Sequence, residues 1–110
     1  MAEEEISIDE FHRMELTTAK VVECEKVQKS RNLLKIIVDV GGVRKQVISS
    51  ISDYYNPEDM IGKTIIIINN LKKARFMGLD SEAMLLSAEN DQTLSLLTTD
   101  KEMPSGIRIK

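Results

Sequence analysis

Residues 64–88 read TIIIINNLKKARFMGLDSEAMLLSA, and they decide the fold of this 110-residue chain. The first five residues are all β-branched, which predicts a buried strand. Two amides and three cations follow it, and small or soft side chains lead from there into a second apolar run that begins at Ala83. A strand end of this composition suits a surface that receives phosphates and one or two bases.

The segments around this stretch predict more strands. Apolar, often alternating residues mark five of them, at 18–27, 33–40, 43–51, 63–69 and 83–88. Gly41-Gly42 supplies the positive φ of a tight turn, so the second and third strands form a hairpin. Pro57 begins a single helical turn before the fourth strand. Three strands, a short helix and two strands is the order of an all-β OB-fold, the five-stranded Greek-key barrel.

Both ends of the chain extend beyond the five predicted strands. Ser7 and Glu10 have the spacing of a capping box, which predicts a short N-terminal helix over about 8–14. Short strands are expected at 93–97 and 107–109 near the C-terminus. We expect one domain over 1–110, in which about 1–15 and 93–110 are flanking extensions. The apolar residues of these extensions predict either a homodimer surface or packing against the chain's own barrel. These residues are Ile6, Ile8, Phe11, Leu96, Leu97, Met103 and Ile107.

Composition restricts the kind of nucleic-acid binding that is expected. The formal net charge is -3, whereas proteins that coat nucleic acid without selectivity are usually basic. Aromatic residues make up 4%, too few for a protein that stacks base after base. Acidic residues gather at Glu3-Glu4-Glu5, far along the chain from Lys72, Lys73 and Arg75. A local basic patch on an acidic molecule therefore remains the expectation.

Catalytic and metal-binding chemistry has no support in the sequence. Cys24 is the single cysteine, which excludes an internal disulfide, and His12 is the single histidine, with no second ligand nearby. Ser49-Ser50 lacks a neighbouring base or a nucleophile elbow. We therefore expect no cofactor, no metal and no enzyme active site. The acidic N-terminus and the short apolar runs predict a cytoplasmic protein with no membrane association.

The chain resembles the tRNA-binding domain that is appended to, or works beside, some methionyl- and tyrosyl-tRNA synthetases and also occurs alone. The pattern N-L-K-x-A-[KR]-x-x-G-x-x-S-x-x-M runs from Asn70 to Met84. Further matching segments cover nearly the whole chain in one order, at 6–11, 16–21, 33–41, 47–51, 54–58 and 96–104. Three positions depart from the family pattern: Thr17 replaces an arginine, Ser50 a glycine and Ala83 a glycine.

The resemblance implies a set of nucleic-acid-binding residues. Asn70 is suited to a base edge, Lys72 to a phosphate, and Arg75 to a phosphate or the face of a base. Ser81 and Met84 correspond to the family's S-x-x-M pair, and Met84 is also suited to core packing. Two further candidates lie on the surface that OB-folds generally use for oligonucleotides, and they are Arg31 and Lys35.

The function implied is non-catalytic binding of tRNA by its shape. The protein would act alone or as the beta subunit, or trans-acting domain, of a methionyl-tRNA synthetase, and the expected partners are tRNA, a second copy of the chain and that synthetase. An alternative from the same fold family is a secretion-type chaperone that binds unfolded peptides. Phe76, Met77 and Met84 would then form its apolar pocket.

Overall fold

Two short helices and nine strands make up the fold in a computed structural model that describes residues 4–110. Residues 1–3 of the predicted domain, Glu3 among them, lie outside the described residues. The helices are α1 (Ile8–His12) and α2 (Pro57–Met60). The strands are β1 (Leu16–Lys26), β2 (Leu34–Val40), β3 (Val43–Ser49), β4 (Thr64–Ile68), β5 (Ala74–Phe76), β6 (Leu79–Ser81), β7 (Met84–Leu85), β8 (Ser87–Glu89) and β9 (Leu94–Leu96). The all-β class and the short N-terminal helix are confirmed.

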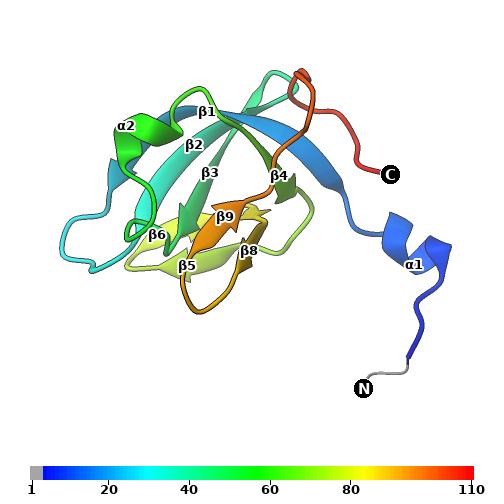
Figure 1. Ribbon diagram of the computed structural model, residues 1–110, viewed down its shortest axis with the longest axis horizontal. Coiled ribbons are helices and arrows are strands. Elements are labelled where there is room, and N and C mark those ends of the chain that lie inside the picture. The colour runs from blue at the N-terminus through cyan, green and yellow to red at the C-terminus, as the bar shows by residue number, and fades with distance from the viewer. Residues whose placement is uncertain (1–3) are drawn as a thin grey trace.

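Five of the strands form one antiparallel sheet in the order β3–β2–β1–β4–β7, which curls around a core (Figure 1). The long β1 pairs with β4 through residues 16–20 and with β2 through residues 20–26. Its register shifts between Val21 and Glu23, and a bulge of this kind bends a strand. One strand can therefore take part in both halves of the barrel. The predicted OB-type barrel is confirmed.

The core follows from the side-chain alternation of the strands. Leu34, Ile36 and Val38 of β2 are fully buried, while the residues between them are only partly buried. Ile65 and Ile67 of β4 join them, and so does Met60 of α2, with no exposed surface. The β-branched run thus forms the buried strand that the sequence predicts, and α2 contributes its one buried side chain to the same core.

The barrel closes between β3 and residues 80–82 through side chains as well as backbone. The Gln46 N–H donates to Glu82 Oε1 at 2.8 Å, and the Glu82 N–H donates to the Gln46 carbonyl at 2.8 Å. The Ile48 N–H donates to Ser81 Oγ at 3.0 Å, and the Ser81 hydroxyl donates to the Ala83 carbonyl at 3.0 Å. Ser81, only 5% exposed, therefore has a structural role at the barrel seam.

The stretch after β4 differs from the prediction in two ways. The predicted strand 83–88 is divided, because β7 pairs with β4 while β8 leaves the sheet to pair with β9. The segment between the fourth and fifth predicted strands, for which the sequence predicts no strand, contains the hairpin β5–β6. Its turn is Met77-Gly78, with φ of 52° and 80°, the left-handed backbone of a two-residue hairpin turn.

The C-terminal tail is fastened to the first residues of β1, and the end of α1 is fastened to the tail. The tail runs beside β1, where the Gly106 N–H donates to the Thr18 carbonyl at 2.7 Å and the Ile109 N–H to the Leu16 carbonyl at 2.8 Å. Arg108 Nη2 donates to the His12 carbonyl at 2.8 Å and to the Met14 carbonyl at 3.2 Å, and so caps the C-terminal end of α1. The helix α1, with its predicted capping box present, projects from the barrel (Figure 1).

Candidate nucleic-acid interface

The hairpin β5–β6 and the loop before it carry the cations that the sequence singled out. Lys72, Lys73 and Arg75 are exposed, and no ion pair connects either lysine to another residue within 4–110. Arg75 Nη1 lies 3.7 Å from Asp80 Oδ1 across the hairpin, and its Nη2 donates to the Gly78 carbonyl at 3.2 Å. An exposed pair of this kind is weak, so the guanidinium remains available to an anion.

An apolar hollow of about 130 Å³ opens beside this hairpin, and we call it the mouth hollow. Its residues come from β3, from the loop after β4, and from β5 to β7. Buried residues contribute Ile48, Ser81 and Ala83, and exposed residues contribute Leu71, Lys72, Ala74, Phe76 and Met84. The sequence-predicted residues Lys72, Ser81 and Met84 therefore come together at one place, with Arg75 on the same hairpin.

Asn70 lies next to this hollow but fastens another part of the molecule. Its Oδ1 accepts a hydrogen bond from the Glu15 N–H at 2.9 Å, and its Nδ2 donates to the Arg13 carbonyl at 2.8 Å. One donor and one acceptor of the amide thus hold the chain that follows α1 against the loop after β4. The first role of Asn70 is structural, and its contact with a base stays a prediction.

Arg31 and Lys35 lie apart from the mouth hollow. Lys35 borders a separate hollow with residues 25–28 and with Leu79 of β6, which pairs with Phe76 across the hairpin. Lys35 Nζ lies 3.5 Å from Glu25 Oε2, which offsets part of its charge. Arg31 is exposed in the loop between β1 and β2 and lines neither hollow. The structure therefore links Lys35 to the hairpin more directly than it links Arg31.

The acidic part of the molecule is remote from the hairpin tip. The helix α1 carries Asp9 and Glu10 in its first turn and projects at one end of the molecule, while β5 and β6 lie toward the other end (Figure 1).

Thr17, where the family pattern has an arginine, is 7% exposed, and its hydroxyl has no hydrogen-bond partner within the described chain. A phosphate contact from this position is excluded by burial.

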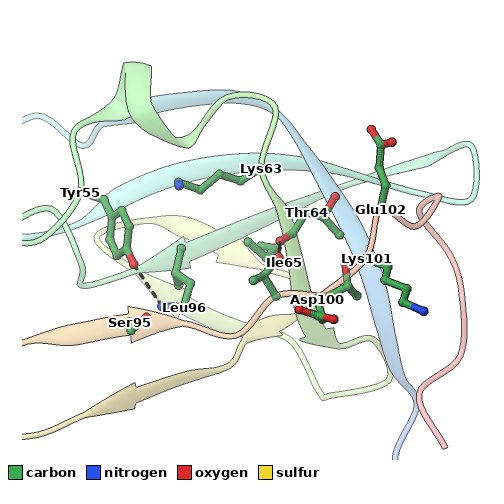
Figure 2. Close-up of a pocket in the computed structure, with 11 residues that line it drawn as sticks. Tyr55, Lys63, Thr64, Ile65, Ser95, Leu96, Asp100, Lys101 and Glu102 are labelled. Atoms are coloured by element: carbon green, nitrogen blue, oxygen red, sulfur yellow. Dashed lines mark hydrogen bonds between the residues drawn. The ribbon is translucent and has the colours of Figure 1, made fainter.

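A larger hollow of about 470 Å³ lies between the start of β4 and residues 95–102 (Figure 2). Tyr55 Oη accepts a hydrogen bond from the Leu96 N–H at 3.1 Å, and Lys63 Nζ lies 5.7 Å from the Tyr55 ring centroid. The charged residues around it are of both signs, with Lys63 and Lys101 opposed by Asp100 and Glu102. Such a balance gives little attraction for a polyanion.

The described residues offer no sign of other chemistry. Within 4–110 no three acidic, histidine or cysteine side chains form a cluster that could hold a metal ion, and no helix is long and apolar enough to span a bilayer. Burial, followed by the charges of Glu25 and Glu58, raises the pKa of the Cys24 thiol to about 11. The thiol is therefore protonated at neutral pH and is a poor nucleophile.

Sequence reasoning missed several residues that shape the mouth hollow. Leu71, Ala74 and Ile48 carry no charge or polar group that marks a binding site, and Phe76 was assigned only to the peptide-binding alternative. The hairpin that holds Ala74 and Phe76 had one usable signal. Glycine at position 78, the second residue of the Met77-Gly78 turn, favours a two-residue hairpin turn.

The fold and site together define a small OB-type β-barrel with a cationic, partly apolar mouth. The family model described as "Putative tRNA binding domain" matches residues 16–108. The chain therefore belongs to the tRNA-binding domain family.

Individual relatives agree with this assignment. The chain is 44% identical to the methionine–tRNA ligase of Thermotoga maritima over 94% of its own length, but it spans only 16% of that ligase. A solved structure of a MetRS-related protein from Pyrococcus horikoshii matches with a TM-score of 0.91 and 32% identity, over 98% of this chain and all of that one. The chaperone CsaA from Bacillus anthracis matches with a TM-score of 0.89 and 27% identity, over 97% of this chain and all of that one.

Proposed function

We propose that this protein is a non-catalytic tRNA-binding protein that recognises tRNA by its shape. The observation that supports this most strongly is the cluster of Lys72, Lys73 and Arg75 beside the mouth hollow, on a molecule whose net charge is -3. This cluster of cations holds RNA backbone there, while the net negative charge of the whole molecule disfavours contact elsewhere. RNA duplexes hide their base edges in a deep, narrow major groove, so backbone contacts and a few splayed bases are the expected means of recognition.

The test compares three nucleic acids at one ionic strength. Folded tRNA, a linear single-stranded RNA of the same length and a DNA duplex are titrated against the protein, and tRNA is expected to bind tightest. Lys72→Ala with Arg75→Ala should weaken tRNA binding and lower the slope of log affinity against log salt by about two, since each phosphate contact contributes about one. Equal affinity for the three nucleic acids would remove the proposal.

The partner proteins are part of the same proposal. The protein acts alone or as the beta subunit, or trans-acting domain, of a methionyl-tRNA synthetase, in line with the naming of its relatives. A pull-down from a lysate of the source cells distinguishes the two, because a subunit should retain a methionyl-tRNA synthetase that lacks a domain of this kind, whereas a protein that acts alone should retain none. We also propose a cytoplasmic location, and cell fractionation checks it.

A homodimer is proposed from the apolar ends of the chain. Ile6 and Ile8 are each 66% exposed, and Met14 and Leu71 border the groove between α1 and the end of β4. Ile6, Ile8 and Met14 leave exposed apolar surface on and beside the projecting helix α1, and such surface suits a second copy better than it suits water. Light scattering at low concentration should give twice the monomer mass, and a monomeric mass would overturn the dimer.

A chaperone that binds unfolded peptides is the second candidate. It is favoured by the likeness to the chaperone CsaA and by the apolar walls of the mouth hollow. The Lys72→Ala/Arg75→Ala variant separates the two functions, because tRNA binding needs the cations and peptide capture by an apolar hollow does not. Unchanged tRNA affinity in that variant, with peptide binding present in the wild type, would favour the chaperone.

A further inference from the structure

We infer that the mouth hollow receives one unpaired pyrimidine base of the bound RNA. The inference rests on the proposed function and adds a base-sized subsite to it. The hollow measures about 130 Å³. An engineered apolar cavity of roughly 150 Å³ holds benzene, while sites for drug-sized ligands run from about 300 Å³ upward. The mouth hollow therefore accommodates one six-membered ring, and a purine leaves its second ring outside.

The walls have the chemistry of a stacking site. Phe76, Met84 and Leu71 are each more than two-fifths exposed, although all three are large and apolar. Phe76 offers a π-face to a base, and the thioether of Met84 adapts its shape to a flat ring. A base that enters covers these side chains together and removes their apolar surface from water.

The charge at the hollow favours a nucleotide over an apolar side chain of a peptide. Lys72 is the charged residue that lines it, whereas Arg75 lies between the lining residues Ala74 and Phe76 on β5, with its side chain on the opposite face of that strand. A base always arrives with a phosphate attached, so an apolar recess lined by Lys72, which forms no ion pair within 4–110, matches both parts of a nucleotide. An apolar peptide side chain gains nothing from the cations.

The buried side of the hollow predicts little discrimination between the two pyrimidines. Ile48 and Ala83 contribute apolar atoms there, and the single hydrogen of the Ser81 hydroxyl is donated to the Ala83 carbonyl. No side-chain donor remains at that position to read a pyrimidine carbonyl. Uracil and cytosine are therefore held alike, by stacking and by size.

Ala74→Leu tests the recess, because it fills the hollow without a change of charge. Ala88→Leu is the matched control, since Ala88 is exposed on β8 and does not line the hollow. Ala74→Leu should bind tRNA roughly tenfold more weakly, the loss expected when one stacked base is displaced. Its salt slope should stay that of the wild type, because no phosphate contact is lost. Ala88→Leu should bind as the wild type does.

Phe76→Ala gives the same test without added bulk, and thermal unfolding of each variant shows whether it is folded. Phe76→Ala should also weaken tRNA binding roughly tenfold at an unchanged salt slope. Wild-type affinity in either folded variant would overturn the subsite. Loss of peptide binding in Ala74→Leu with unchanged tRNA affinity would instead make the hollow a site for a peptide side chain.

The preference for pyrimidines is tested with RNA chains that are abasic except at one central position. Competition against labelled tRNA should rank uridine and cytidine equally, above adenosine, and adenosine above the fully abasic chain. The ranking should disappear in Ala74→Leu. An abasic chain that competes as well as the uridine chain, or an adenosine chain that competes better, overturns the inference. If wild-type tRNA binding depends on Lys72 and Arg75 while these rankings fail, the proposed function stands and only the subsite is lost.

Discussion

Replacement of Gly106 by alanine should detach the C-terminal tail from the barrel. Gly106 has φ of +83°, and a Cβ at this residue would lie 2.8 Å from Gly41 Cα and 2.9 Å from Gly41 N. Both neighbours are backbone atoms of the turn between β2 and β3, so neither can rotate away as a side chain would. The left-handed backbone costs alanine about 1 kcal/mol, and an overlap of this kind adds about 1–3 kcal/mol.

The matched control is Gly62→Ala. Gly62 has φ of +93°, but no atom lies within 4 Å of the position that its Cβ would take. Alanine there suffers only the backbone strain of about 1 kcal/mol. For a chain of this size we expect a fall in Tm of about 4 °C for Gly62→Ala and roughly 12 °C for Gly106→Ala.

Calorimetry measures both values, and amide hydrogen exchange shows where the structure has loosened. In Gly106→Ala the N–H groups of Thr18 and Ile109, which are hydrogen bonded between the tail and β1, should lose protection before those of β2. Equal Tm losses in the two variants would refute the reasoning, because they would mean that the close approach to Gly41 carries no energy.

Three further predictions concern single side chains. Asn70→Ala should destabilise the protein by about 2 kcal/mol, because two hydrogen bonds are lost, and should speed proteolysis next to α1. The control Asn56→Ala should do neither, since the hydrogen bond from the Asn56 side chain to Asp59 is long at 3.5 Å. Denaturant unfolding and limited proteolysis measure these effects. The Cys24 pKa of about 11 predicts slow alkylation of the thiol at pH 8. The folded state also holds this proton more tightly than the unfolded chain, so the stability that Cys24 contributes is present at neutral pH and lost as pH rises toward 11. Urea titrations of Cys24→Ala should not show that loss. Hydrogen bonds from Ser105 and the Gly42 N–H lower the pKa of Asp39, so its contribution is present near neutral pH and lost as pH falls through the folded-state pKa; Asp39→Asn should show less acid-dependent loosening of the tail by hydrogen exchange.

Features that the sequence predicted well depend on neighbouring residues. The capping box joins Ser7 to Glu10, three positions apart, and the turn at Gly41-Gly42 needs only its own two glycines. The buried strand β4 consists of one threonine followed by consecutive isoleucines. Local patterns of this kind have one structural solution, because period and turn chemistry restrict the backbone directly.

Features that the sequence could not reveal join residues far apart in the chain. Ser81 bonds to Ile48 across 33 positions, and Asn70 to Glu15 across 55. A serine or an asparagine in a polar loop has the same composition whether it contacts a ligand or fastens the barrel. The division of the last predicted strand into β7 and β8 likewise depends on β9, which competes for pairing beyond Leu85.

The fastening of α1 has a consequence for any assembly built on this chain. Asn70 and Arg108 grip the end of this helix from two sides, one from the loop that leads to the cationic hairpin and one from the final residues of the chain. A projecting helix that is hydrogen bonded at two points keeps a fixed orientation relative to the barrel. If two copies join through these helices, the distance and the angle between their two mouth hollows are fixed, and an L-shaped RNA would meet two binding surfaces at a constant spacing.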